Sequence, residues 1–173
     1  MPSTPTTRSY ILRSTRIQNL ATSIQHAAPT DFIAIPARLA HKASIMPKRE
    51  IKHPDKEKST GAYSAAVEID GWVYVSGQGP VDPKTGQPVR GTIEEETRYT
   101  LNQIKRILET AGCTLNDVVK STVHLADIGE FDRYNTVYRN FFKEVAILPA
   151  RTTVQSVLWN GITVEIDVVA RKH

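Results

Sequence analysis

The chain has 173 residues, a length that fits one domain and leaves little for a second. Hydrophobic residues make up 40% of it, which is enough to bury a core and argues against wholesale disorder. No apolar run approaches the ~20 residues of a membrane span. The single cysteine, Cys113, excludes an internal disulfide and a multi-cysteine zinc site within one chain.

The formal charge of +4 belongs to the N-terminal segment. Residues 1–48 contain six basic side chains and one acidic side chain, which leaves 16 basic and 17 acidic residues for the remainder. A folded nucleic-acid-binding domain usually carries a basic face of its own. The charge distribution therefore argues against a nucleic-acid partner for the rest of the chain.

Residues 1–45 differ in composition from the C-terminal part of the chain. They contain eleven Ser and Thr, scattered arginines and almost no acid, which is typical of an organellar transit peptide, and they lack the apolar segment of a secretory signal. We expect a disordered leader over residues 1–45, a folded domain over 47–173, and a location in the mitochondrial matrix, with plastid or cytoplasm as alternatives. An upstream start codon, with Met46 as the true initiator, is the competing explanation.

The first elements of the domain are predicted to form a β-hairpin. The extended runs Ser64–Ile69 and Trp72–Ser76 flank Asp70-Gly71, a pair that suits a type I′ turn because both central residues need positive φ. Residues 82–86, Asp-Pro-Lys-Thr-Gly, indicate a second, looser turn.

An amphipathic helix is predicted next. Thr92 and Glu95 have the spacing of a capping box, and Gly112 is placed to end the helix. Its apolar stripe has the period of an α-helix and comprises Ile93, Thr97, Leu101, Ile104, Ile107, Leu108 and Ala111. Cys113 comes just after the helix end, where we expect a packed, inert thiol.

A strand is predicted over Val118–Leu125, and a second helix after it. Asp127 and Glu130 have capping-box spacing. The apolar stripe of this helix comprises Phe131, Tyr134, Val137, Tyr138, Phe141 and Phe142. Two further strands, Arg151–Leu158 and Ile162–Ala170, flank Asn160-Gly161, which is again a strong signal for a two-residue hairpin.

The resulting order, ββαβαββ, predicts an α+β fold in which two helices pack on one face of a mixed β-sheet. Each helix has one apolar stripe to bury, so both must cover the same face. In the last strand Ile162, Val164, Ile166 and Val168 alternate with Thr163, Glu165 and Asp167. The uncovered face needs a third layer, and we expect other subunits to supply it.

Four short segments contain residue types that could carry chemistry: Gly61–Ser64, Val75–Pro80, Pro149–Val154 and Val164–Asp167. Read alone, each has an ordinary structural explanation. Tyr63 could be an aromatic at a strand edge, Arg151 could form a surface salt bridge, and Glu165 could face solvent. Their combination and order are more informative than any single segment.

Taken together, these segments closely resemble the RidA (reactive intermediate deaminase) family, small homotrimeric proteins with a chorismate-mutase-like fold. The resemblance runs from about residue 50 to the C-terminus. It includes Gly-x-Tyr-Ser at 61–64, Ser-Gly-Gln at 76–78, Ala111-Gly112, Asp117 to Lys120, Phe131 to Phe142, Pro149-Ala150-Arg151 and Val164 to Asp167.

The resemblance implies hydrolysis of reactive enamines and imines, such as 2-aminoacrylate and 2-iminobutanoate, to 2-oxo acids and ammonia. By position, Arg151 would bind the substrate carboxylate and Glu165 would hold the attacking water. The implied pocket, located between subunits of the trimer, is lined by Tyr63, Ser76, Gly77, Asn135 and Thr153. The alternatives are an endoribonuclease or translation inhibitor, and a non-catalytic trimer that binds a small ligand.

The chemistry of these residue types fits those roles. A guanidinium binds a carboxylate through two parallel hydrogen bonds, which fixes orientation as well as charge. Hydration of a C=N bond needs a water beside a proton acceptor, and a carboxylate can serve. No metal, nucleotide or flavin is required. The five histidines show no paired ligand spacing, and we expect His124 to be structural or exposed.

The predicted final hairpin separates the two charged residues. In that register Arg151 and Glu165 lie roughly 16 Å apart along the ladder, too far for one small substrate. Either the turn register differs or an interface brings the two residues together, and we expect the interface. The chain also departs from the family pattern at Ala62, where proline is usual, at Thr153, where cysteine is frequent, and at Gly79. Gly79 replaces a branched apolar residue, which predicts a wider pocket that favours larger side chains.

Overall fold

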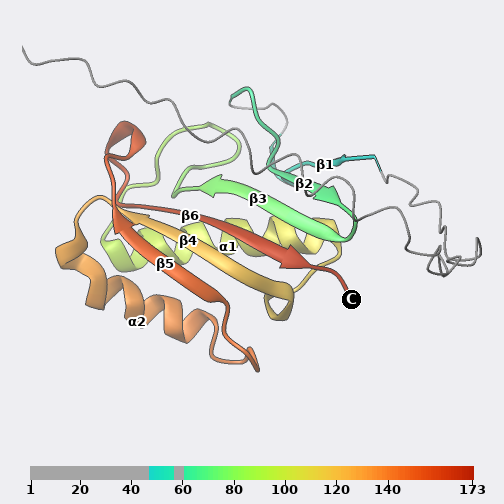
Figure 1. Ribbon diagram of the computed structural model, residues 1–173. Helices are drawn as coiled ribbons and strands as arrows, with labels where there is room; N and C mark the ends of the chain where they lie inside the picture. The colour runs from blue at the N-terminus through green and yellow to red at the C-terminus, as the bar shows by residue number, and fades with distance from the viewer. Residues whose placement is uncertain (1–46, 57–60) are drawn as a thin grey trace, which may run out of the picture. The chain divides into compact units, whose positions relative to one another are not determined.

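The computed structural model describes residues 47–56 and 61–173 (Figure 1). The leader predicted for residues 1–45 lies outside this part of the chain. Among the described residues, no helix combines the length and apolar character that crossing a membrane requires.

Six strands form one mixed sheet, covered on one face by two helices (Figure 1). The helices are α1 (Ile93–Ala111) and α2 (Phe131–Phe141). In sheet order the strands are β1 (Arg49–Ile51), β2 (Ala66–Ile69), β3 (Trp72–Gln78), β6 (Val164–Arg171), β4 (Val118–Leu125) and β5 (Ala150–Gln155). The predicted α+β fold is confirmed, and the short strand β1 is an addition that sequence patterns did not indicate.

The first hairpin forms as predicted. Ile69 pairs with Trp72, and the two residues between them, Asp70 and Gly71, have φ values of 50° and 77°. Both values lie in the left-handed region that a type I′ turn demands.

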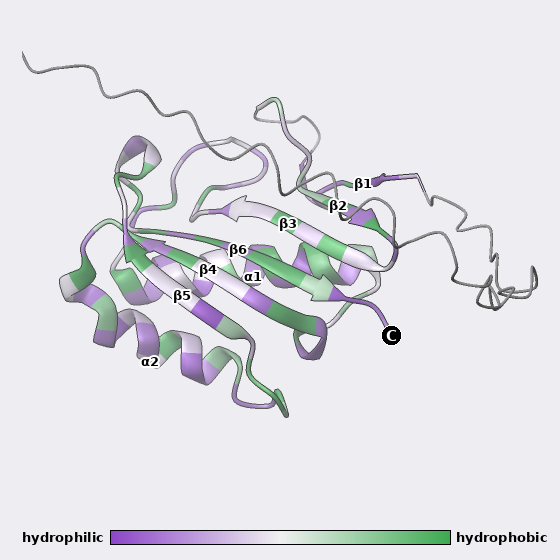
Figure 2. Ribbon diagram, in the orientation of Figure 1, coloured by the Kyte–Doolittle hydropathy of each residue, from purple (hydrophilic) through white to green (hydrophobic). Residues whose placement is uncertain are grey.

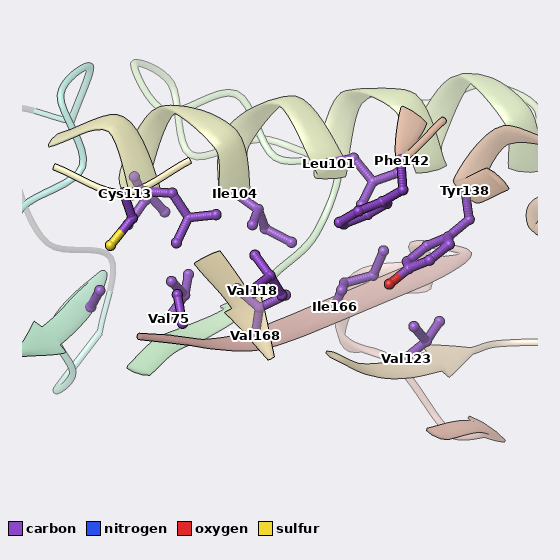
Figure 3. Packing of buried hydrophobic residues seen from close by; sticks show 14 of the residues in the cluster. Val75, Leu101, Ile104, Cys113, Val118, Val123, Tyr138, Phe142, Ile166 and Val168 are labelled. Atoms are coloured by element: carbon purple, nitrogen blue, oxygen red, sulfur yellow. The ribbon is translucent and has the colours of Figure 1, made fainter. Parts of the chain in front are cut away.

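Helix α1 has the predicted ends. The side chain of Thr92 accepts from the backbone N–H of Glu95, whose side chain accepts from the N–H of Thr92, and Gly112 ends the helix at φ 79°. Its whole apolar stripe is buried. Leu101 and Ile104 point from α1 towards Val75, Ile166 and Val168 on the sheet, as Figure 3 shows.

The predicted capping box of the second helix is wrong. Asp127 instead caps a single 3-10 turn, Ile128–Glu130, by accepting from the N–H of Gly129 at 2.8 Å. Helix α2 begins only after this turn, and its N-cap residue, Glu130, makes no capping hydrogen bond through its side chain. The carboxylate of Glu130 binds Arg133 at 2.7 Å, so it is unavailable for the reciprocal bond of a capping box.

The predicted hairpin between the last two strands is also wrong. β5 pairs in parallel with β4, and β6 inserts antiparallel between β3 and β4. Asn160 and Gly161 still have positive φ values, 48° and 66°, but they belong to a 3-10 turn, Trp159–Gly161, within a crossover connection. Arg90 hydrogen-bonds both of their carbonyl groups.

Burial explains why β6 takes the central place. Val164, Ile166, Val168 and Ala170 are all buried, whereas none of the side chains of β5 is. A strand with a continuous apolar face gains most by lying over both helices, and a polar strand such as Arg-Thr-Thr-Val-Gln is suited to an edge.

The second face of the sheet has no cover within the described chain. Burial alternates along β6 and along β4 from Ser121 onward, and hydrophobic and hydrophilic residues are interspersed on both strands (Figure 2). The face opposite the helices therefore carries polar groups together with exposed large side chains. Trp72, Tyr74 and Val154 of this face are 37%, 44% and 39% exposed. An exposed apolar surface of this kind is a common feature of interaction faces.

Candidate functional site

A pocket of about 310 Å³ lies at the end of β3. β2 pairs with β3 only between Trp72 and Val75, so the strand end beyond Ser76 is accessible from the side. The pocket is lined by His53, Lys56, Tyr63, Gly77, Gln78, Gly79, Val81, Gly86, Gln103, Trp159, Ile162 and Glu165. It therefore contains three of the predicted site residues, Tyr63, Gly77 and Glu165.

Gly77 is required by the close approach of Glu165. A Cβ atom on Gly77 would lie 2.3 Å from Oε1 of Glu165, much nearer than two such atoms can come. The carboxylate thus extends over the backbone of β3 towards the pocket. The half-buried Glu165 has no ion-pair partner among the described residues, so its oxygens can accept hydrogen bonds from a water or a ligand.

Ser76 supports the pocket without lining it. Its hydroxyl donates to the carbonyl of Ser64 at 2.8 Å, and its backbone N–H donates to the carbonyl of Ala65 at 3.0 Å. These bonds fix the segment that carries Tyr63 beside β3. Gln78 adds rigidity, because its side-chain amide donates to the carbonyls of Ser76 and Gly77.

The beginning of β6 is anchored by a buried carboxylate of α1. Glu96, which is 3% exposed, accepts from the backbone N–H and hydroxyl of Thr163 at 2.8 and 2.6 Å. Its other oxygen accepts from the N–H of Gly91 at 3.2 Å. Thr163 lies two residues before Glu165, so these bonds hold the catalytic candidate in register.

His53 and Gln103 form a wall of the pocket that sequence reasoning missed. His53 is 4% exposed, and its Nδ1 accepts from the backbone N–H of Asp55 at 3.1 Å. Its Nε2 therefore carries the proton and donates to Oε1 of Gln103, 2.7 Å away. Burial is the main reason that the pKa of His53 lies below its ordinary value. No local motif links these residues, which come from the N-terminal strand region and from α1.

Arg151 lies in a second place, between β5 and α2. Its guanidinium stacks over the ring of Tyr138 at 4.6 Å from the centroid and approaches Tyr134 and Phe131 at 5.5 and 5.7 Å. One nitrogen donates to Oδ1 of Asn135 at 2.9 Å, and another to the hydroxyl of Tyr134 at 3.4 Å. The aromatic stripe of α2 thus forms a floor beneath a cation.

This half-buried arginine has no carboxylate partner among the described residues. Asn135 and the ring of Tyr138 fix the plane of the guanidinium, and the remaining N–H donors of the guanidinium are available to an anion. Burial raises the pKa of Tyr134 far above its ordinary value, against the opposing effects of Arg151 and Thr153. The tyrosine therefore stays neutral and leaves the positive charge of Arg151 uncompensated.

One chain does not bring Arg151 and Glu165 together. Through the ladders, Glu165 aligns with His124 and Val154, whereas Arg151 aligns with Ser121. The backbones of Arg151 and Glu165 are therefore two strands apart across the sheet and three residues apart along it. With ~4.8 Å between strands and ~3.3 Å between residues, the distance between them is about 14 Å. Arg151 also faces α2, whereas Glu165 lies on the opposite side of the sheet. The hairpin register was wrong, but the separation that it predicted remains.

The other candidates have structural roles. Nδ1 of His124 lies 2.8 Å from the hydroxyl of Ser156, and Cys113 is buried with its pKa raised by burial. The space beside Gly79 is filled by Ile162, whose Cδ1 would lie 2.6 Å from an added Cβ. The expected widening of the pocket at Gly79 is therefore offset. Among the described residues, no group of three or more His, Cys, Asp or Glu could hold a metal ion.

Three features define the class of this protein: a six-stranded mixed sheet with two helices on one face, a glycine-rich end of β3, and an arginine on the edge strand β5. It is an α+β domain of the Rid type. The family model described as endoribonuclease L-PSP matches residues 54–172. The chain belongs to this family, the RidA family that the motifs indicated.

Relatives extend this result over nearly the whole domain. A RutC family protein of Pyrococcus abyssi is 41% identical over 129 residues, which is 74% of this chain and all of the relative. The 2-iminobutanoate/2-iminopropanoate deaminase of Homo sapiens is 40% identical over 128 residues, covering 73% of this chain and 92% of that protein.

Solved structures share the fold. A Rid-family protein of unknown function from Yersinia pestis has a TM-score of 0.69 and 37% identity, and the match covers 73% of this chain and 100% of that one. Escherichia coli TdcF with bound serine has a TM-score of 0.67 and 31% identity, with 72% and 99% covered. These solved structures confirm the predicted fold, and their sequence identities of 37% and 31% indicate relatedness as well as a shared architecture.

Proposed function

We propose that this protein hydrolyses 2-imino acids, and the enamines that give rise to them, to 2-oxo acids and ammonia. The single observation that carries the proposal is Arg151, a half-buried, aromatic-stacked guanidinium with no acidic partner in the described chain. Such a group matches the planar carboxylate of an imino acid. The deaminase names of relatives from mouse, human and rat, 43%, 40% and 44% identical, support the same reaction.

The reaction requires little chemistry from the protein. Water adds to the carbon of the C=N bond and gives a proton to Glu165, and the nitrogen of the resulting tetrahedral adduct takes up a proton. The C–N bond then breaks, ammonia leaves, and loss of the hydroxyl proton forms the carbonyl of the 2-oxo acid. A protonated imine is already electrophilic, so orientation of the water and the carboxylate supplies much of the rate.

The proposed active unit is a homotrimer in which Arg151 of one chain completes the pocket of its neighbour. Three features support it: the separation of Arg151 from Glu165 within one chain, the free edge of β5, and the exposed apolar groups on the uncovered sheet face. In that arrangement Tyr63, Gly77 and Glu165 come from one subunit. Asn135 and Thr153 accompany Arg151 from the other.

The test couples a pyridoxal-phosphate dehydratase, which releases 2-aminoacrylate from serine, to the purified full-length protein. Arg151→Ala should lower kcat/KM by at least about 100-fold, since it removes a bidentate charge-assisted contact. Arg151→Lys should recover only a part of the lost kcat/KM, because lysine keeps the positive charge but cannot form the two parallel hydrogen bonds of a guanidinium. Arg139→Ala, which removes an exposed arginine of α2, serves as the control. Wild-type activity in Arg151→Ala would overturn the proposal.

The description of the family model also names an endoribonuclease. RNA cleavage measured on the same preparations separates the two activities. If RNA cleavage, rather than imine hydrolysis, disappears in Arg151→Ala, the proposed substrate class is wrong. A protein that binds 2-oxo acids through Arg151 but never accelerates imine hydrolysis is a ligand-binding trimer instead.

A further inference from the structure

The pocket contains a second charged group whose role the proposed reaction does not explain. Lys56 lines the same cavity as Glu165 and is half-buried. No acidic side chain pairs with it within residues 47–56 and 61–173. Its neighbour Asp55 is already committed to Arg106 at 2.6 Å. A partly buried ammonium without a counterion is a site for an anionic ligand.

The polar groups beside Lys56 are already engaged. His53 uses both ring nitrogens, one for the N–H of Asp55 and one for Gln103. The side-chain amide of Gln78 donates to backbone carbonyls. These residues form a preorganised wall, and the charged groups that remain to meet a ligand are Lys56 and Glu165.

The size of the pocket points in the same direction. Pockets of about 300 Å³ and above accommodate drug-sized ligands, and this one measures about 310 Å³. An imine with the methyl side chain of alanine would leave much of that space empty. Ile162, Val81 and Trp159 supply an apolar surface for additional methylene groups.

We propose that Lys56 binds a second carboxylate, carried at the far end of the substrate side chain, so that the preferred substrates are imines of dicarboxylic amino acids. This inference rests on the proposed function, in which Arg151 of the neighbouring subunit holds the carboxylate next to the C=N bond. The two cations then match the two negative charges of the substrate. Glu165 acts on the carbon between them, and the reaction is the same hydrolysis to a 2-oxo acid and ammonia.

Turnover of two imines by the full-length protein tests this proposal. A flavin amino-acid oxidase generates the imine of alanine or of aspartate in the presence of semicarbazide, and the enzyme competes with semicarbazide for each. Wild type should show the higher kcat/KM with the aspartate imine. Lys56→Met should lower that value at least about tenfold, the factor that 1.4 kcal/mol represents, and change the value for the alanine imine less than about twofold.

Two further variants make the comparison specific. Lys56→Arg keeps the charge and should retain the preference for the dicarboxylic imine. Lys52→Met removes an exposed lysine that does not line the pocket and should behave as wild type. Equal losses on both imines, or no loss on either, would overturn the assignment of Lys56.

Binding measured by calorimetry distinguishes this inference from the proposed function. Oxaloacetate and pyruvate are the 2-oxo acids that correspond to the two imines. If wild type binds oxaloacetate more tightly than pyruvate and Lys56→Met loses this difference, the subsite is supported. That conclusion would hold even if wild type hydrolysed neither imine, and only the proposed reaction would then be wrong. Hydrolysis of both imines without any effect of Lys56 on rate or binding would leave the reaction standing and remove the subsite.

Discussion

Arg151 and Glu165 share an unusual environment for charged side chains. Each is half-buried, and neither has an oppositely charged partner in the described chain. Buried charge is normally paired or neutralised because desolvation is costly. Neighbours hold both groups in place instead: Tyr138 and Asn135 fix Arg151, and the bare backbone of Gly77 makes room for Glu165. Such preorganisation is expected at a binding site.

Gly77→Ala tests the role of this close approach. The added methyl group would meet Oε1 of Glu165 at 2.3 Å and push the carboxylate aside. Because a misplacement of about 1 Å can cost about 100-fold in rate, we expect kcat/KM for imine hydrolysis to fall by about that factor. The free energy of unfolding should change by less than about 1 kcal/mol, since a flexible side chain can move.

The matched control is Gly79→Ala, which adds the same group two residues away; its tight contact, at 2.6 Å, is with the Cδ1 of Ile162 rather than with a carboxylate, and the carbonyl oxygen of Val164 lies at an ordinary 3.5 Å. It should keep most of the activity. The interpretation fails if Gly77→Ala retains full turnover, or if both variants lose activity together with their folded structure.

Among the elements, α1 does most to position the pocket. It supplies Glu96, which anchors the start of β6, and Gln103, which holds His53 at the pocket wall. The first turn of α1 is thus bound to β6, the strand of Glu165, and a later turn of α1 is bound to His53, which lies three residues before Lys56.

Glu96→Ala should destabilise the domain by about 3 kcal/mol, because it removes hydrogen bonds to a buried, charged acceptor and leaves two half-buried donors of Thr163 unpaired. Chemical denaturation measures the loss. Glu94→Ala on the same helix removes an exposed, solvent-screened ion pair to Arg133 and should change the free energy of unfolding much less. Similar losses in the two variants would contradict the anchoring role of Glu96.

The buried His53 predicts a pH dependence of stability. Its pKa in the folded protein lies below 6.5, mainly because burial penalises the charged form. The unfolded chain therefore takes up the proton first, so stability is full above the ordinary pKa and is lost as the pH falls below about 6.5. Unfolding free energies between pH 8 and pH 5 should decline more steeply for wild type than for His53→Gln. Parallel curves would show that His53 is not the titrating group.

The accuracy of the sequence predictions depended on the range of the interactions. Thr92, Glu95 and Gly112 define α1 through contacts within a few residues, and the turn at Asp70-Gly71 is equally local. The pairing of β6 is not local. Asn160 and Gly161 do adopt turn conformations, but the partners of β6 are chosen by burial over both helices, which no short motif records. The polar composition of β5 was the available sign of an edge strand.

The candidate site shows the same limit. Motifs predicted Tyr63, Gly77, Arg151 and Glu165 as candidate site residues, but they could not show that these residues lie in two separate places in one chain. Lys56, His53 and Gln103 had no sequence signal, because they meet at the pocket only after the segment that follows β1 packs against α1. Their part in the site depends on tertiary structure alone.

At the scale of the whole molecule, the proposed trimer would make function depend on assembly, because one chain alone keeps Arg151 and Glu165 apart. In a cyclic trimer every interface is heterologous, so each chain would give its Arg151 to one neighbour and receive the same residue from the other. A variant that disrupts the trimer but keeps both residues should therefore be inactive.

Complementation between two inactive variants tests this central claim most directly. Arg151→Ala and Glu165→Gln are unfolded together in equal amounts, refolded to allow mixed trimers, and assayed for imine hydrolysis. If the active site is shared, a site is intact when its arginine comes from a Glu165→Gln chain and its glutamate comes from an Arg151→Ala chain. Each condition is met in half of the cases, so about a quarter of wild-type activity should return. If the mixture stays as inactive as the separate variants while mixed trimers are present, each site lies within one chain and the account is contradicted.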